Sequence, residues 1–223
     1  MTTEGLSELY QARFSERERA AKDAIWQVLC QDYFQQFVRP DATVLDIACG
    51  YGEFIRHIHA GRKLAIDLNP GVGAGLPSDI QFFLTGADQM TGIASGSVDV
   101  CFTSNFFEHL ASHRAMDAVL QEARRVLAPG GRFICMQPNI RYAYDKYWDF
   151  YDHVLPLSHL SASEGFAKNG YQIERVVPRF VPFSTKSAYP KHPWFVRTYL
   201  KLPLLWRVLG GQFVIVARSP TPG

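Results

Sequence analysis

Short apolar runs alternate with amphipathic segments along most of this 223-residue chain. Apolar runs bounded by Gly, Pro, Asp or Asn are typical of buried strands, whereas apolar residues at three- and four-residue steps are typical of helices. The runs predict strands at residues 44–48, 63–67, 80–84, 98–103, 132–137, 171–180 and 211–218. The helical spacing predicts helices at residues 6–38, 53–59, 113–127 and 161–169, and at 194–209 with a break at Pro203.

Strands that alternate with helices predict an α/β fold with a seven-stranded, mostly parallel sheet covered by helices on both faces, in a single domain. We expect residues 1–40 to form an N-terminal helical cap and residues 41–223 to form the main domain, with insertions near residues 138–160 and 181–210 that cover an acceptor. In such sheets, ligands bind beyond the carboxyl ends of the strands.

The composition is that of a globular protein, with 47% hydrophobic and 20% charged residues and a net charge of +2. No apolar run reaches eighteen residues, the N-terminal segment is highly charged, and the four cysteines have no C-x-x-C spacing. We therefore expect a cytoplasmic protein with reduced cysteines in its core. Residues 175–223 hold eight Lys and Arg and no acidic residue, which leaves residues 1–174 with a net charge of −6.

The segment that follows the first predicted strand is a turn of small residues. The strand carries Asp46 and ends at Ala48, and Gly50 and Gly52 lie in the turn before the next helix. Such a turn lets backbone N–H groups and a helix N-terminus face a negatively charged ligand. It resembles the first motif of class I S-adenosylmethionine (SAM) dependent methyltransferases, with Ala48 in the place of that motif's first glycine.

A dinucleotide site is the alternative for such a turn. Its fingerprint is G-x-G-x-x-G, in which the third glycine allows close packing of helix and strand. Here Gly50 and Gly52 supply the first two glycines, but Ile55 occupies the third position. A bulky β-branched residue there favours SAM over NAD or FAD.

Later segments extend the resemblance in the family's order, over roughly residues 40–140. An acid that ends the second strand, followed by an apolar residue, resembles the family's ribose-binding position. The segment Gly86–Met90 resembles its adenine-binding motif, and a residue near Asn105 borders the methionine portion. The resemblance implies a Rossmann-like fold with SAM as cofactor, bound by Asp46, Ala48, Gly50, Gly52, Asp67, Leu68, Asp88, Gln89 and Asn105.

The segment Arg124–Gly131 is similar to the family's R-x-L-x-P-G-G segment, which is a helix stop and a tight turn. The closest similarity is to the small-molecule branch, which includes quinone and sugar methyltransferases.

If the acceptor is a hydroxyl, a base must remove its proton, and histidine suits that role. The candidates are His109, after the fourth strand, and His153, which Asp152 would orient. A structural role for each histidine is the alternative. The sequence indicates no metal site.

We therefore expect a SAM-dependent methyltransferase that acts on a small molecule, by O-methylation of a hydroxylated, sugar-like or lipid-linked acceptor. A SAM-binding, non-catalytic partner protein is the alternative from another class. The modest net charge disfavours nucleic acid as a partner and RNA or protein as a substrate. Residues 194–209 interleave basic, aromatic and aliphatic side chains, which indicates either contact with a membrane or lipid-linked substrate or packing on the sheet.

Overall fold

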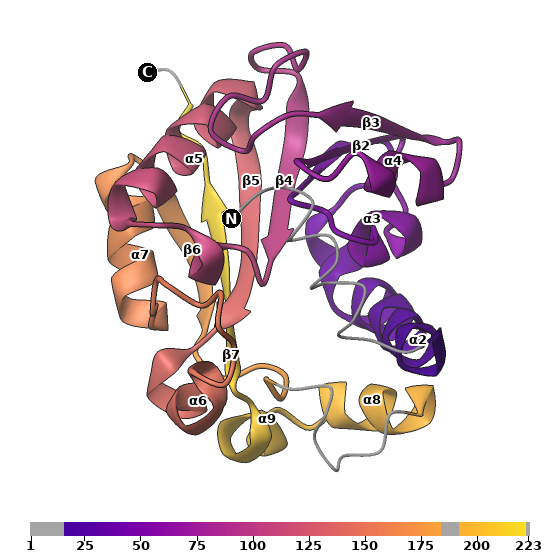
Figure 1. The fold of residues 1–223 in the computed structure, drawn as a ribbon, viewed down its shortest axis with the longest axis vertical. Helices are drawn as coiled ribbons and strands as arrows, with labels where there is room; N and C mark the ends of the chain where they lie inside the picture. Colours follow the sequence, from indigo (N-terminus) through magenta and orange to yellow (C-terminus); the bar gives the residue numbers. More distant parts are fainter. Residues whose placement is uncertain (1–15, 184–191, 222–223) are drawn as a thin grey trace.

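A computed structural model describes residues 16–183 and 192–221. Within these residues, seven strands form one sheet in the order β3-β2-β1-β4-β5-β7-β6, with β7 antiparallel to both neighbours (Figure 1). The predicted mostly parallel α/β sheet is therefore confirmed. The strands are β1 (Thr43–Ile47), β2 (Arg62–Asp67), β3 (Ile80–Leu84), β4 (Val98–Ser104), β5 (Leu127–Pro138), β6 (Gln172–Val177) and β7 (Gln212–Arg218).

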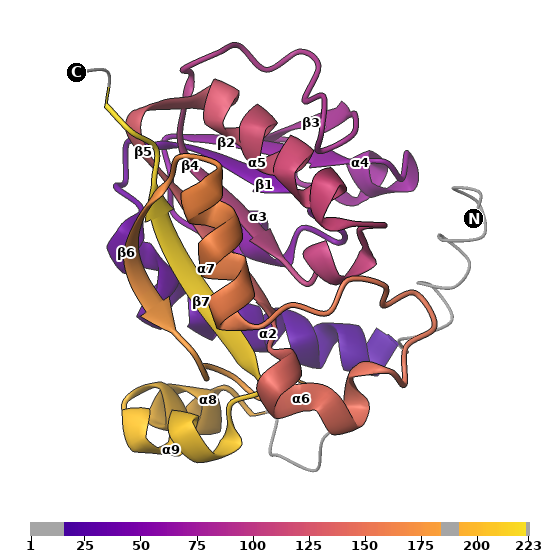
Figure 2. The same ribbon diagram turned by 90° about the vertical axis from the view of Figure 1, so that its left-hand side faces the viewer.

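Helices cover both faces of the sheet, with α5 and α7 on one face and α2 and α3 on the other (Figure 2). No helix among the described residues is long and apolar enough to cross a membrane. The helices are α2 (Glu16–Asp32), η1 (Phe34–Phe37), α3 (Glu53–His57), α4 (Gly71–Gly75), η2 (Phe107–His109), α5 (His113–Val126), α6 (Ile140–Tyr147), α7 (His159–Lys168), α8 (Pro193–Leu200) and α9 (Pro203–Leu209).

The N-terminal helix is described from Glu16, and the part predicted at residues 6–15 lies outside the described residues. The helix ends at Asp32, and a short 3-10 helix follows, so the predicted single helix over residues 6–38 is wrong at its C-terminal end. The predicted break at Pro203 is confirmed, because this proline begins α9. Helix α6 lies in the region 138–160, which the sequence pattern assigned to an insertion without a helix.

Each face of the sheet has its own hydrophobic core. Leu45 and Ile47 of β1 pack on the side of α5 and α7, whereas Val44 packs on the side of α2 and α3. This division follows from the alternation of side chains along a strand. On the second side, the rings of Phe54 and Phe102 stack with centroids 3.6 Å apart and join α3 to β4.

The turn predicted after α5 is part of an irregular strand. Leu127 already pairs with Val98, and the register between β4 and β5 shifts before Arg132 pairs with Val100. Gly130 has φ +74°, a left-handed conformation that glycine adopts without steric cost. Strand β5 therefore begins five residues earlier than predicted, because a β-bulge takes up the Pro-Gly-Gly turn.

The order of the strands reverses between β1 and β4, which pair in parallel in the middle of the sheet. The connections that leave these two strands run in opposite directions. In folds of this kind, ligands bind in the crevice outside the carboxyl ends of two such strands. The glycine turn follows β1 and Asn105 follows β4, which brings the two predicted cofactor-binding segments to this point.

Candidate active site

The turn after β1 has three residues in the left-handed region of backbone conformation. Gly50 and Gly52 have φ +54° and +74°, and Ala48 has φ +55°. A side chain in this region costs about 1–2 kcal/mol. Ala48 therefore adopts the conformation that a glycine would adopt more easily, and the turn keeps its shape at a cost in stability.

The two glycines have different surroundings. A Cβ on Gly52 would lie 2.4 Å from Leu76 Cδ2, so this glycine allows close packing beside the N-terminus of α3. A Cβ on Gly50 would meet no atom within 4 Å. Gly50 therefore borders open space at the carboxyl end of β1, where a ligand can approach the backbone closely.

Asp67 ends β2 and lies against this turn. One oxygen, Oδ2, accepts the N–H of Gly50 at 2.9 Å, and Oδ1 accepts the N–H of Asn69 at 2.8 Å. Each carboxylate oxygen can accept further hydrogen bonds, so a ribose diol would find two oriented acceptors here. The open space at Gly50 would let SAM approach the protein backbone closely, and the carboxylate of Asp67 suits the hydroxyl groups of its ribose.

Asp46 is a buried residue of β1, two residues before Ala48. It is only 3% exposed and accepts the backbone N–H of Ile55 in α3. Burial, with the negative charges of Glu53 and Asp67 nearby, raises the pKa of its carboxyl well above the usual range. The structure thus gives Asp46 a role in joining β1 to α3.

The predicted adenine segment follows β3. Asp88 and Gln89 are exposed, and the exposed side chain of Leu68 lies 3.9 Å from the position of a Cβ on Gly86. Met90, in contrast, is fully buried in the core, so it anchors the segment. Leu68 is therefore the apolar side chain that lies near this segment at the surface.

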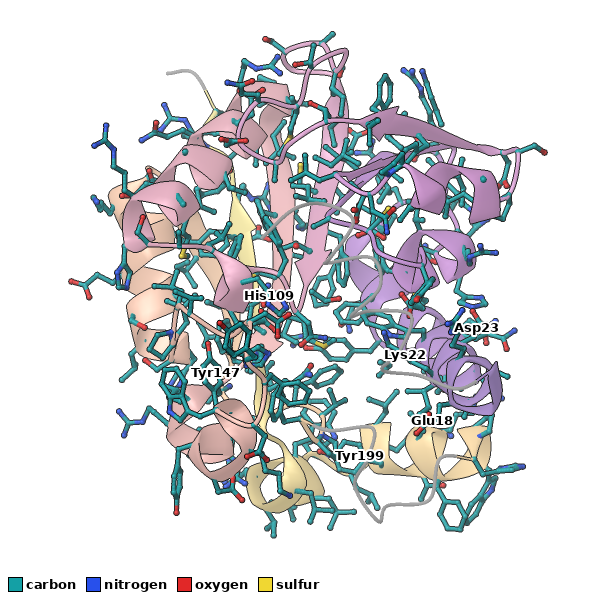
Figure 3. The ribbon with its side chains drawn as sticks, viewed as in Figure 1. Glu18, Lys22, Asp23, His109, Tyr147 and Tyr199 are labelled. Atoms are coloured by element: carbon teal, nitrogen blue, oxygen red, sulfur yellow. The ribbon has the colours of Figure 1, made fainter. Side chains whose placement is uncertain are left out.

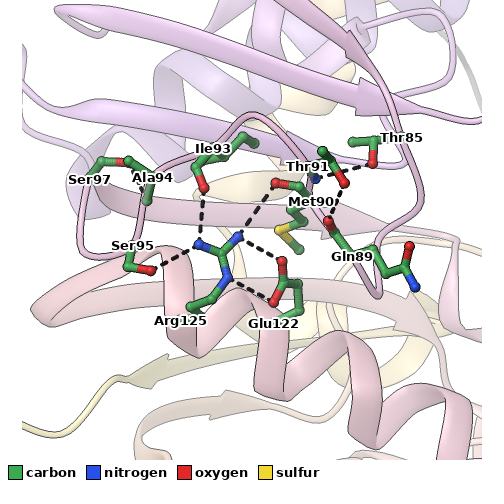
Figure 4. Close-up of polar contacts among 10 residues, drawn as sticks. All are labelled: Thr85, Gln89, Met90, Thr91, Ile93, Ala94, Ser95, Ser97, Glu122 and Arg125. Atoms are coloured by element: carbon green, nitrogen blue, oxygen red, sulfur yellow. Dashed lines mark hydrogen bonds and ion pairs between the residues drawn. The ribbon is translucent and has the colours of Figure 1, made fainter.

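Arg125 of α5 holds the residues after this segment in place (Figure 4). Its guanidinium donates to the carbonyl of Ile93 at 3.0 Å and to the Ser95 hydroxyl at 3.0 Å, and it forms two hydrogen bonds with Glu122. Arg125, in the segment that is similar to R-x-L-x-P-G-G, thus holds the loop that follows the predicted adenine segment.

Beyond β4, Asn105 has φ +47° and belongs to a group of side-chain amides. Its Oδ1 accepts from Gln212 Nε2 at 3.1 Å, and Gln137 Oε1 accepts the N–H of Phe106 at 3.0 Å. Gln137 Nε2 and Gln212 Oε1 are buried and have no hydrogen-bond partner. The sequence did not single out these two glutamines; the only signal was a polar residue at the edge of an apolar strand.

The structure brings together the three predicted catalytic residues. His109 Nδ1 lies 3.0 Å from the backbone oxygen and 3.3 Å from Oδ2 of Asp152, and the rings of His109 and His153 are 5.1 Å apart. In Figure 3, His109 lies near the carboxyl ends of β4 and β5, close to Tyr147 of α6. Asp152 and His153 are 9% and 8% exposed, so the cluster is largely buried.

Glu108 also belongs to this cluster, although the sequence did not indicate it. It is 3% exposed, and its Oε2 has no hydrogen-bond partner. Burial, together with the charge of Asp152, raises the pKa of Glu108 to about 8. Glu108, His109 and His153 each offer a ligand atom, and these atoms lie within 4.8 Å of one another.

The mostly parallel sheet, the glycine turn and the acid that ends β2 together are the features of a class I SAM-dependent methyltransferase fold. Residues 45–135 match the family described as "Methyltransferase domain", so this part of the chain has the domain of the expected family, with SAM as its cofactor.

Among curated proteins, the chain is 30% identical to demethylmenaquinone methyltransferase of Symbiobacterium thermophilum over 51% of this chain and 52% of that protein. It is 30% identical to the ubiquinone/menaquinone biosynthesis C-methyltransferase UbiE of Brucella anthropi over 61% of this chain and 57% of that protein. The chain thus spans little more than half the length of these relatives.

Among solved structures, the fold is similar to that of a protein in the complex between the Haloferax volcanii Trm112 methyltransferase activator and a methyltransferase. The TM-score is 0.67 at 20% identity, and the match covers 92% of this chain and 94% of that chain. This likeness extends the fold assignment beyond the matched methyltransferase domain.

Proposed function

We propose that this protein transfers the methyl group of SAM to a small-molecule acceptor that carries a hydroxyl group. The observation that supports this most strongly is the placement of the two halves of the site. The glycine turn and Asp67 lie at the carboxyl ends of β1 and β2, and the cluster of His109, Asp152 and His153 lies beyond the neighbouring strand β4. A cofactor position and a polar group for the acceptor thus share one edge of the sheet.

The relatives favour a quinol as acceptor over a sugar. The names of these relatives describe methylation of demethylmenaquinone and C-methylation in ubiquinone and menaquinone biosynthesis. This favours a ring carbon as the methylated atom, in contrast to the expected O-methylation. Loss of a proton from a ring hydroxyl raises the electron density at the oxygen and at the adjacent carbons, so either atom then becomes a better nucleophile. Attack on the methyl group would break its bond to the sulfur of SAM and release S-adenosylhomocysteine. A ring carbon that receives the methyl group would then lose its hydrogen as a proton.

In this proposal, the histidine cluster promotes that proton loss. Hydrogen bonding to Asp152 orients the His109 ring, and an imidazole has a pKa suited to general base catalysis near neutral pH. The regions around residues 138–160 and 181–210 contain α6, α8 and α9, which we propose as the acceptor-covering insertions of a main domain over residues 41–223. Residues 1–40, including α2, would form its cap.

The direct test is methyl transfer from labelled SAM to reduced demethylmenaquinone, with a hydroxylated sugar as the comparison acceptor. We expect label in the quinol, bound to carbon, and none in the sugar. Label in the sugar alone would contradict the proposed acceptor. Normal SAM binding without transfer to any hydroxylated acceptor would favour the non-catalytic alternative.

A lipid-linked acceptor is also supported by the surface of α8 and α9. One side of this helical pair is anchored: Leu200 is buried, and Trp206 Nε1 donates to the carbonyl of Tyr199 at 2.9 Å. The opposite side exposes large apolar side chains beside the exposed Lys201 and Arg207. The exposed apolar residues are Trp194, Phe195, Leu202, Leu204, Leu205 and Val208.

We propose that this surface contacts anionic lipid, because apolar side chains flanked by basic ones favour binding at a membrane interface. The double variant Leu204→Glu with Val208→Glu should reduce sedimentation with phosphatidylcholine–phosphatidylglycerol vesicles about tenfold or more. Each substitution removes apolar area that the membrane would bury and adds a negative charge that anionic lipid repels. Leu160→Glu, at an exposed leucine of α7, is the matched control. Equal sedimentation of the double variant and the control would contradict the proposed contact.

A further inference from the structure

The cluster beyond β4 combines the donor types of a metal site. Glu108 and His109 come from η2, and His153 comes from the segment between α6 and α7. Their ligand atoms lie within 4.8 Å of one another. A cation with ligands about 2.0–2.2 Å away requires ligand atoms roughly 3–4 Å apart, so small side-chain rotations suffice to close the site.

Glu108 supplies an independent indication that a ligand belongs here. Its Oε2 is buried without a hydrogen-bond partner, and a buried carboxyl oxygen that lacks a partner is costly. The backbone around it is held firmly, because the carbonyl oxygen of Glu108 accepts the N–H groups of Val154 at 2.7 Å and Leu155 at 3.0 Å. These bonds fasten the segment of His153 to that of Glu108, although 45 residues separate the two in sequence.

The histidines are oriented by their neighbours. His109 Nδ1 must donate to the carbonyl oxygen of Asp152, so a cation would bind through Nε2. A histidine whose second nitrogen donates to a carbonyl or carboxylate is a common feature of metal sites. The ring of His153 stacks on Phe150 with centroids 4.8 Å apart and meets the edge of Tyr147 at the same distance. This packing restricts the ring to one orientation.

We propose that Glu108, His109 and His153 bind a divalent transition-metal cation, with Asp152 as the outer partner of His109. Two imidazole nitrogens and one carboxylate suit Zn²⁺, Co²⁺, Mn²⁺ or Fe²⁺ better than Mg²⁺ or Ca²⁺, which favour oxygen ligands. Three protein ligands leave a coordination position open for a further ligand. The cation would balance the negative charge of Asp152 and would stabilise the ionised form of Glu108.

The role of the cation rests on the proposed function, whereas its binding does not. Bound at this position, the cation would take the hydroxyl oxygen of the acceptor as a ligand, and this hydroxyl would release its proton to solvent more readily. The two histidines would then act as metal ligands. The cation, in place of a histidine base, would promote the loss of the hydroxyl proton.

The test uses full-length, untagged protein that has been treated with a chelator and then titrated calorimetrically with Zn²⁺ and Co²⁺, with Mg²⁺ for comparison. We expect one equivalent of Zn²⁺ or Co²⁺ to bind, weak or absent Mg²⁺ binding, and a Co²⁺ absorption spectrum typical of mixed nitrogen and oxygen ligands. Glu108→Gln and His153→Gln should each weaken Co²⁺ binding at least about 100-fold, since loss of an outer partner alone costs 10–100-fold.

Glu164→Gln and His59→Gln, both at exposed positions, are the matched controls and should leave Co²⁺ binding unchanged. Glu108→Gln keeps the shape of the side chain and removes a buried charge, so we expect it to fold, as SAM binding would verify. Absence of stoichiometric Zn²⁺ and Co²⁺ binding, or binding that neither Glu108→Gln nor His153→Gln weakens, would overturn the proposal. If the protein transferred methyl groups but bound no metal, the proposed metal site would be wrong and the proposed function would stand. If it bound metal but transferred no methyl group, the proposed function would be wrong and the metal site would stand.

Discussion

Asp67→Ala should lower the affinity for SAM about 100-fold or more. The carboxylate is oriented by the N–H groups of Gly50 and Asn69, and in the proposed binding mode each oxygen accepts one ribose hydroxyl. A hydrogen bond to a charged group contributes about 1.5–3 kcal/mol, so loss of two such bonds costs about 3 kcal/mol or more. Calorimetric titration with SAM and S-adenosylhomocysteine measures this change directly.

Asp99→Ala is the control for this variant. Asp99 also accepts a backbone N–H, that of Thr43 at 2.8 Å, but it lies near the amino ends of β1 and β4. Both variants therefore lose a carboxylate that accepts a backbone N–H, and we expect similar changes in unfolding free energy. Only Asp67→Ala should weaken SAM binding. An equal loss of affinity in both variants would show that the effect comes from stability and would remove Asp67 from the cofactor site.

Gly50→Ala should weaken SAM binding about tenfold or more, or about 1.4 kcal/mol. The added methyl group would project into the open space at the carboxyl end of β1, where the cofactor approaches the protein backbone in the proposed binding mode. The left-handed φ of +54° adds a conformational cost of about 1–2 kcal/mol to the stability of the folded protein. Titration with SAM and denaturant unfolding measure the two effects separately.

Gly96→Ala isolates the binding effect from the conformational one. Gly96 has φ +66° and, like Gly50, no atom within 4 Å of an added Cβ, but it lies in the loop before β4. It should therefore lose a similar unfolding free energy and bind SAM as the unsubstituted protein does. If the two variants bound SAM equally well, the space at Gly50 would not be part of the cofactor site.

The order of strands and helices could be predicted because its signals are local. Apolar runs, helical spacing and the turn at residues 48–52 depend on neighbours in the chain, and the structure confirms the sheet that they predict. The errors lie where a tertiary contact outweighs the local signal. Strand β5 extends back to Leu127 because this residue pairs with Val98.

The sequence by itself determined the class of fold and the cofactor, because the turn after β1 and the acid that ends β2 are short segments with their own chemistry. Only the tertiary structure decided what surrounds the proposed acceptor position. Glu108 and His153 come from distant segments, and Gln137 and Gln212 from antiparallel strands. Their proximity depends on how the elements pack and not on any local pattern. The proposed metal site therefore follows from the fold, whereas the SAM cofactor could be predicted from the sequence.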